Sequence, residues 1–191
     1  MQLKHLLTLL LFVPGLLQAE SELTAEQIED LLEVKIRFAT HMAFHPSIVR
    51  AVETQNSQAL PLAEIKNRDE IWKNAGDSLN GLIREVTQND IARYFQRRVE
   101  NNSAIDEVFL TDNQGANVAA YPPTSDYWQG DEEKWTASWA DGEGRMFIGP
   151  LEYDESTDKY AVQISAPVKD GVDTIGVLVV GVSIDYVSGR Q

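Results

Sequence analysis

Three things are scarce in this sequence of 191 residues: cysteine, positive charge and long apolar runs. Because there is no cysteine, disulfide bonds and thiolate chemistry are excluded, and the core must be held by packing. Lys and Arg number 16 against 30 Asp and Glu, and the net charge of −14 disfavours binding to nucleic acid and to anionic lipid. Beyond the N-terminus no segment is apolar enough to span a bilayer. The nearest candidate, residues 175–182, is short and β-branched, which indicates a buried strand.

The N-terminus has the features of a secretory leader. Lys4 and His5 precede an apolar run from Leu6 to Leu17, and Ala19 offers a small residue for cleavage before an acidic stretch. The run is shorter than the about 20 apolar residues that a membrane-spanning helix needs, although an uncleaved anchor is the alternative interpretation. The sequence therefore predicts a signal peptide over residues 1–19, cleaved near Ala19, and a single periplasmic domain over residues 20–191.

The first half of that domain, about residues 23–103, is patterned for helices. Apolar residues recur at the helical period from residue 28 to residue 43. His45-Pro46 must end or kink this helix, because the residue before a proline avoids the α region. Further helices are expected over residues 47–55, over residues 61–73 and in a long segment towards Val99 that is interrupted near residues 87–90.

The second half, about residues 105–186, is patterned for strands. A tight turn at residues 112–115 joins the first two strands, and Pro122-Pro123 stops the second. The expected strands are residues 107–111, 117–121, 145–152, 159–168 and 174–184, with a short helix at about residues 131–139. Helices gathered before five antiparallel strands predict an α+β domain.

Five short motifs in this half carry a resemblance to a known family. They are Asp106–Gly115, Thr124–Glu132, Ile148-Gly149 followed by residues 153–156, Ile164–Val168 and Ile175–Leu178. Their order and spacing over residues 105–186 resemble the Cache (PAS-like, or PDC) sensor domains of bacterial receptors. The long first helix, the break at Pro46 and the segment from Asp69 to Trp72 are similar to those domains as well.

The resemblance implies a long N-terminal helix that packs, with further helices, on a five-stranded antiparallel sheet of PAS-like order. It also implies a pocket between the sheet and the segment joining its second and third strands, of a kind that binds carboxylates, amino acids, amines or purines. Members of the family usually continue into a transmembrane helix and a cytoplasmic output domain, whereas this sequence ends shortly after the last strand. We therefore expect the domain to report to a separate membrane receptor or kinase.

The segment over the expected pocket is rich in aromatic and acidic residues. Tyr127, Trp128 and Trp135 are candidates for the pocket wall, because small-molecule sites combine apolar walls with a few polar groups. Asp131 is a candidate to hold a cationic or hydrogen-bonding group of the ligand. The alternative is that the tryptophans pack as a lid and that Asp131 is the N-cap of the short helix.

Strand residues provide further candidates, namely Tyr121, Phe147, Tyr160 and Gln163. Side chains alternate along a strand, so Tyr160 and Gln163 cannot both point into the pocket without a bulge. The predicted ligand-binding set is Tyr121, Tyr127, Trp128, Asp131, Trp135, Phe147 and Tyr160.

The sequence offers little for catalysis or metal binding. His41 and His45 stand four residues apart on a helix, a spacing that can chelate zinc, but no third ligand is evident nearby. There is no nucleophile with an adjacent base and no phosphate-cradling loop. We therefore expect no enzymatic activity, no metal and no cofactor.

Two functional hypotheses remain. In the first, the chain is an extracytoplasmic sensor module that recognises a small metabolite (an amino acid, amine or carboxylate) and reports to a membrane signalling partner. In the second, it is a non-catalytic structural or interaction protein whose pocket is filled by its own side chains. In either case the first helix offers an apolar stripe for pairing with a second copy, although packing on the domain's own sheet explains the stripe equally well.

Overall fold

The computed structural model describes residues 25–75, 81–154 and 159–183. The predicted leader with its cleavage point near Ala19, and the residues after 183, lie outside this range. None of the helices in the described ranges combines the length and the apolar character that crossing a membrane requires.

Five helices precede the sheet: α1 (Ala25–Ala43), α2 (Pro46–Asn56), α3 (Leu62–Lys73), α4 (Gly81–Thr87) and α5 (Asp90–Glu100). The predicted break at Pro46 is confirmed, and His45 becomes the N-cap of α2 because its ring accepts a hydrogen bond from the backbone N–H of Ser47. The predicted interruption before residue 90 is confirmed too. Asn89 caps α5 by accepting from the backbone N–H of Ala92 at 2.9 Å.

The sheet consists of β1 (Ile105–Thr111), β2 (Asn117–Tyr121), β3 (Phe147–Ile148), β4 (Glu152–Asp154), β5 (Lys159–Asp170) and β6 (Asp173–Ser183). The strands are antiparallel in the order β2-β1-β6-β5-β3, and β4 also pairs with β5. The α+β class with its antiparallel sheet is therefore confirmed.

The predicted third strand, residues 145–152, is wrong in its extent. It divides into β3 and β4, because the pairing with β5 shifts by one residue between them: Ile148 pairs with Ile164, whereas Glu152 pairs with Ala161. At its start, Arg145 donates its backbone N–H to Ser138 rather than to the sheet. The short helix also begins later than expected: α6 spans Glu133–Trp139 with Glu132 at the N-cap position, so Asp131 is not its N-cap.

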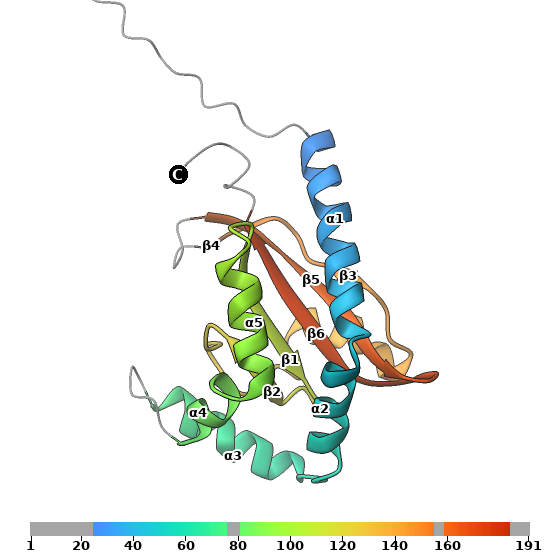
Figure 1. Ribbon diagram of the computed structural model, residues 1–191. Coiled ribbons are helices and arrows are strands. Elements are labelled where there is room, and N and C mark those ends of the chain that lie inside the picture. Colours follow the sequence, from blue (N-terminus) through green and yellow to red (C-terminus); the bar gives the residue numbers. More distant parts are fainter. Residues whose placement is uncertain (1–24, 76–80, 155–158, 184–191) are drawn as a thin grey trace, which may run out of the picture.

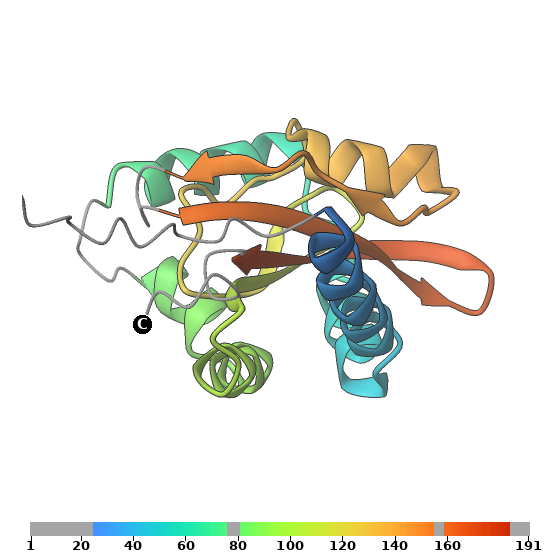
Figure 2. The ribbon, with the colours of Figure 1, turned by 90° about the horizontal axis from the view of Figure 1, so that it is seen from above.

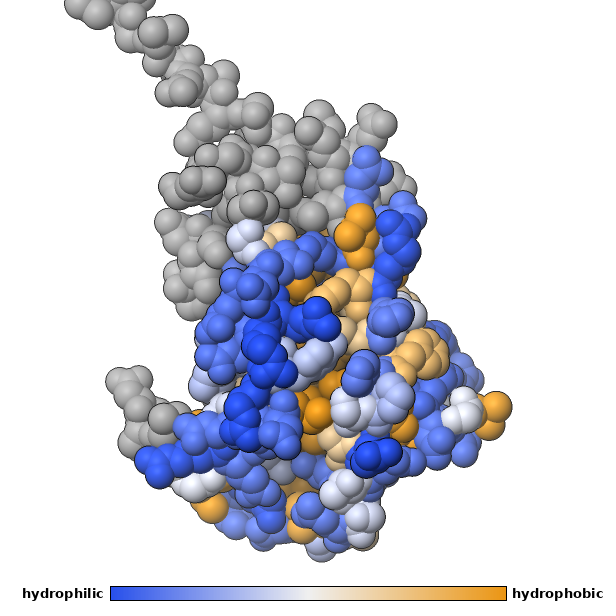
Figure 3. All heavy atoms as spheres, viewed as in Figure 1, coloured by the Kyte–Doolittle hydropathy of each residue, from blue (hydrophilic) through white to orange (hydrophobic). Residues whose placement is uncertain are grey.

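The helices divide between the two faces of the sheet (Figures 1 and 2). On one face, α1, α2 and α5 bury an apolar cluster that includes Ile48, Phe95 and Leu178. On the other face, α3 and α6 lie over a second cluster that includes Phe109, and α4 contributes Ile83 to it. Figure 3 looks onto the first face and shows apolar side chains between α1 and α5, flanked by the hydrophilic outer surfaces of these helices.

Asp112 begins the turn between β1 and β2 and is almost completely buried. Its Oδ1 accepts the backbone N–H groups of Gln114 (2.8 Å) and Ala116 (2.9 Å), and its Oδ2 accepts from Nε2 of Gln55 in α2 (3.0 Å). Burial raises the pKa of this carboxyl above its ordinary value, and the hydrogen bonds oppose that rise. The predicted turn at residues 112–115 is therefore tied to the helical layer through a buried acid.

The raised pKa of Asp112 predicts a pH dependence of stability with a definite sign. Because the folded chain holds the proton more tightly than the unfolded chain, the free energy of unfolding falls as pH rises from the ordinary carboxyl range through the raised pKa. Asp112→Asn cannot titrate, so the stability of the wild type relative to this variant should decline over that window and then stay level. Urea unfolding of both proteins across a pH series measures this difference, and a difference that is constant with pH would contradict the prediction.

Candidate ligand-binding site

A cleft of about 770 Å³ lies on the α6 side of the sheet, between the strands and the connection from β2 to β3. Its floor is made by residues of β1, β5 and β6, and its roof by residues 122–125 and the start of α6. Residues of β3 and β4 and the turn between them close one side. The lining residues are Asp106, Glu107, Pro122, Pro123, Thr124, Ser125, Glu132, Glu133, Lys134, Phe147, Gly149, Pro150, Glu152, Tyr153, Ala161, Gln163 and Gly181.

The floor of the cleft is organised around Glu107. Its Oε1 accepts a hydrogen bond of 2.8 Å from Nε2 of Gln163, which holds the carboxylate across β6. Gly181 lies beneath this side chain, and a Cβ atom there would be 2.4 Å from the Cγ of Glu107. A glycine between two valines of β6 therefore provides the space that Glu107 occupies.

An irregularity in β1 brings two consecutive acids to this floor. The register between β1 and β6 shifts between Ile105 and Glu107. Ile105 packs in the cluster on the opposite face, whereas Asp106 and Glu107 both line the cleft. Such bulges redirect side chains, and regular alternation would have sent one of the two acids to the other face.

The roof contributes a basic side chain. Lys134, in the first turn of α6, reaches towards the sheet, and its Nζ lies 5.7 Å from the ring centroid of Phe109 on β1. Phe109 itself is 1% exposed, so the ammonium group sits above a buried ring.

A second, smaller cleft of about 400 Å³ lies between α3 and the connection from β2 to α6. Its lining includes Lys66, Glu70, Trp128 and Asp131, and the Lys66 ammonium lies 4.7 Å from the ring centroid of Trp128.

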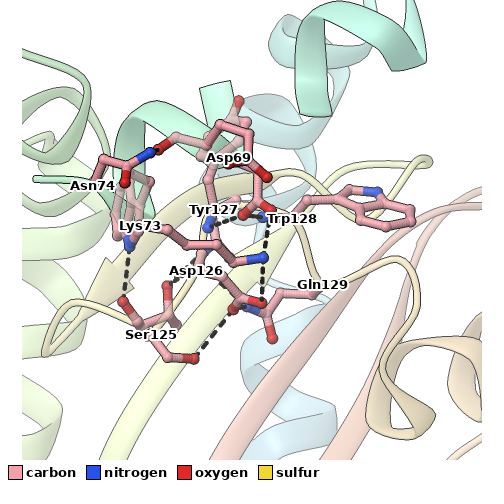
Figure 4. A network of polar contacts seen from close by, with 12 residues as sticks. Asp69, Lys73, Asn74, Ser125, Asp126, Tyr127, Trp128 and Gln129 are labelled. Atoms are coloured by element: carbon pink, nitrogen blue, oxygen red, sulfur yellow. Dashed lines mark hydrogen bonds and ion pairs between the residues drawn. The ribbon is translucent and has the colours of Figure 1, made fainter. Parts of the chain in front are cut away.

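A buried carboxylate holds this connection against α3 (Figure 4). Asp69 is 5% exposed, and its Oδ1 accepts the backbone N–H groups of Tyr127 (2.9 Å) and Trp128 (3.1 Å). Its Oδ2 accepts from Nζ of Lys73 at 2.6 Å, and that ammonium also lies 3.8 Å from Oδ2 of Asp126. One aspartate thus provides the hydrogen-bond acceptor for two backbone N–H groups of the loop.

Two indole groups hold the same connection at other points. Trp72 of α3 donates from Nε1 to the carbonyl of Thr124 at 2.9 Å, and Trp128 donates from Nε1 to the carbonyl of Gln114 at 2.7 Å. The roof of the larger cleft is therefore built from a fixed loop, and a fixed loop preorganises a binding site.

The predicted ligand-binding residues fall in different places. Phe147 lines the larger cleft, whereas Trp128 and Asp131 line the smaller one. Tyr127 is 1% exposed and packs against Trp72, and Trp135 is buried and stacks on Trp139 with ring centroids 5.4 Å apart.

The other two predicted residues line neither cleft. Tyr121 packs with the cluster on the α5 face, and its hydroxyl is 3.3 Å from Oε1 of Glu100. Tyr160 is 49% exposed and meets Tyr153 edge to face. The predicted alternation along β5 holds, because Ala161 and Gln163 line the larger cleft while Val162 and Ile164 are buried on the opposite face.

Of three polar residues that line the larger cleft, the sequence made Gln163 a candidate outside the final predicted set, and it did not point to Glu107 or Lys134 as ligand-binding residues. Gln163 was identifiable as the alternative to Tyr160, because the two had to face opposite sides. Glu107 carries no such signal, since its orientation depends on the bulge in β1.

Among the residues that the structure describes, no group of three or more His, Asp or Glu side chains is placed to hold a metal ion. His45 serves as a helix cap and stacks on Tyr94 at 5.8 Å, while His41 is exposed on α1.

The sheet has the strand order β2-β1-β6-β5-β3, a long helix covers one face, and a cleft lies on the other. This is the architecture that the resemblance to Cache sensor domains implied. Residues 75–189 match the model of the dCache_3 family, described as the double sensory domain of two-component sensor kinase. The match covers more than half of the chain, which therefore belongs to this family of sensory domains. A comparison with curated proteins found no match.

Similar solved structures include sensory domains of receptors and kinases. The sensory domain of the Campylobacter jejuni chemoreceptor Tlp3 is 14% identical, with a TM-score of 0.41 over 83% of this chain and 64% of that chain. The ligand-binding domain of the same receptor in complex with L-valine is 13% identical, with a TM-score of 0.40 over 86% and 66% of the two chains. The sensor domain of the V. cholerae histidine kinase DctB is 15% identical, with a TM-score of 0.39 over 74% and 57%. This chain thus spans less than two thirds of the length of these structures.

Proposed function

We propose that the chain is an extracytoplasmic sensor module that binds a small metabolite in the larger cleft and reports its bound state to a membrane signalling partner. The observation that carries the proposal is the cleft itself, whose volume of about 770 Å³ lies in the range typical of small-molecule sites. Its place in a chain of a sensory-domain family supports the same conclusion.

The proposal assigns the binding site to Glu107, Gln163, Lys134 and Phe147, and retains Trp128 and Asp131 at the smaller cleft as a secondary candidate. Tyr127 and Trp135 act through packing beneath the roof. Residues 20–191 form the proposed sensor module, exported to the periplasm by the leader over residues 1–19. Pairing of two copies through the first helix stays a prediction, for which the exposed Val34 of α1 and Phe44 just after it offer apolar surface.

A thermal-shift screen of the purified protein against amino acids, amines, short carboxylates and purines tests the proposal. A ligand that binds only the folded state stabilises it by about 2.7 kcal/mol at a hundredfold excess over Kd, so one class of compound should raise the melting temperature in a saturable way. If no compound does so, and mass spectrometry finds no co-purifying ligand, the self-filled interaction protein becomes the better description.

Two glycine variants test whether the ligand-induced rise in melting temperature arises from binding in the larger cleft. Gly181→Ala should abolish it, because the new Cβ forces Glu107 out of its position on the floor. Gly81→Ala, where nothing lies within 4 Å, is the matched control and should leave the shift unchanged. If Gly181→Ala shows the same ligand-induced rise in melting temperature as the wild type, the ligand does not bind in the larger cleft.

A further inference from the structure

The larger cleft has a strong excess of one charge. Among the described residues, five carboxyl side chains line it, from Asp106, Glu107, Glu132, Glu133 and Glu152, and one basic side chain does, from Lys134. A cleft lined by one sign of charge concentrates ions of the opposite sign. Since the cleft is the proposed ligand site, its charge bears directly on the class of ligand.

Lys134 is an unusual occupant of this acidic cleft. Its ammonium lies over the ring of Phe109, and no carboxylate within the described ranges comes within ion-pair distance of it. Lys73, by comparison, is paired with Asp69 at 2.6 Å. The cleft therefore already holds one ammonium group, which lies over an aromatic face and forms no ion pair with the described acidic residues of the lining.

Glu107 is positioned to serve an incoming cation. Its hydrogen bond from Gln163 leaves Oε2 available and fixes the carboxylate at the floor, on the same strand and the same face as Phe109. A carboxylate held in place loses little side-chain entropy on binding, so its attraction for an ammonium group is retained.

We propose that the cleft selects organic cations of the amine class, and that Lys134 is a tethered competitor occupying the cation position above Phe109 until a ligand ammonium displaces it. This inference rests on the proposed sensor function and narrows its ligand. Lys134 has a flexible four-carbon stem and can swing out to solvent when displaced. A dicarboxylate would be repelled by five acidic side chains and attracted by one lysine. In a zwitterion, the attraction of the cleft for the amine would be offset by its repulsion of the carboxylate.

A charge-matched series of probes tests the ligand class. Calorimetric titration of the purified protein with 1,4-diaminobutane, 4-aminobutanoate and butanedioate compares a dication, a zwitterion and a dianion of one chain length, and homologues with three and five carbons repeat the comparison. The diamines should bind at least about tenfold more tightly than the others, with an affinity that weakens as salt is added. Tighter binding of a zwitterion or dianion, or no saturable binding of any diamine at millimolar concentration, overturns the inference. The sensor proposal itself falls only if the broader screen also finds no ligand.

Removing the ammonium group of Lys134 tests its role, because the direction of the change in affinity depends on the charge of the ligand. Lys134→Met removes the ammonium and keeps an unbranched stem, so diamine affinity should rise about threefold or more. In a cleft that bound carboxylates, the same variant would weaken binding. A fall or no change in diamine affinity, found also in Lys134→Gln, contradicts the tethered-competitor role.

Two glutamate variants that each remove one negative charge complete the design. Glu107→Gln keeps an oxygen that accepts from Gln163 but should lower diamine affinity about tenfold. Glu143→Gln makes the same change in an exposed residue that pairs with Arg145 outside the cleft, and should change affinity less than about twofold. Equal effects of the two would mean that overall charge, and not the cleft, attracts the cation.

Discussion

Replacing Asp69 with alanine is expected to lower the free energy of unfolding by about 2–4 kcal/mol, one of the largest losses that a single polar substitution should cause here. Asp69 is buried, and its Oδ1 accepts the backbone N–H groups of both Tyr127 and Trp128. Removing the carboxylate leaves these two donors without a partner and costs their desolvation. It also leaves the Lys73 ammonium with Asp126 as its remaining neighbour, at 3.8 Å.

Asp69→Asn separates the contributions. Its Oδ1 still accepts both N–H groups, while the ion pair with the half-exposed Lys73 is lost at a cost of about 1 kcal/mol or less. Urea unfolding of the wild type and both variants gives the comparison. Glu33→Ala, which breaks an exposed pair with Arg37 on α1, is the control and should be close to neutral. Equal losses in Asp69→Ala and Asp69→Asn would show that the ion pair, and not the backbone hydrogen bonds, holds the loop.

Replacing Gly115 with alanine is expected to destabilise the fold by about 3 kcal/mol, because two penalties add at this position. Gly115 has φ of +85°, which an L side chain adopts at a cost of about 1–2 kcal/mol. A Cβ at Gly115 would also lie 2.5 Å from the Cα and N atoms of Gly130, and backbone atoms cannot move aside as a flexible side chain can. The two segments are joined at this point by the hydrogen bond from Gln129 N–H to the Gly115 carbonyl, at 2.8 Å.

Gly171→Ala is the matched control for Gly115→Ala. Gly171, in the turn between β5 and β6, has φ of +59°, but nothing lies within 4 Å of the place its Cβ would take. The backbone cost is therefore similar, and the loss of freedom in the unfolded chain offsets part of it, so the net loss should stay near or below about 1 kcal/mol. Thermal or urea unfolding of both variants measures the difference. Similar losses at the two positions would mean that the contact between Gly115 and Gly130 does not constrain the fold.

Local chemistry accounts for the elements that sequence reasoning predicted well. His45-Pro46 and Asn89 end or begin helices through short-range effects, proline geometry at one site and side-chain capping at the other. The division of residues 145–152 into two strands was not predicted, because it follows from a shift of register against β5 inside a segment whose pattern is β-rich throughout.

The candidate site was predicted less well, because the orientation of a residue on a folded surface depends on distant partners. Tyr127 and Trp135 belong to a segment rich enough in aromatic residues to suggest a binding wall, yet α3 and the sheet bury both rings. Along β5, alternation required Tyr160 and Gln163 to face opposite ways but could not say which face was the cleft. The bulge in β1 that turns both Asp106 and Glu107 to the floor arises from pairing with β6, some 75 residues later in the chain.

The sequence by itself determined most of the helices and strands, the α+β class, the acidic character of the chain and its resemblance to sensory domains. These properties follow from residues close together in the chain, or from composition. Only the tertiary structure decided which side chains meet in the cleft, that Asp69 holds its roof and that Lys134 lies over Phe109. Each of these contacts joins segments that are far apart in the sequence and that meet only when the domain packs. Such a contact leaves no periodic pattern in the sequence of either segment.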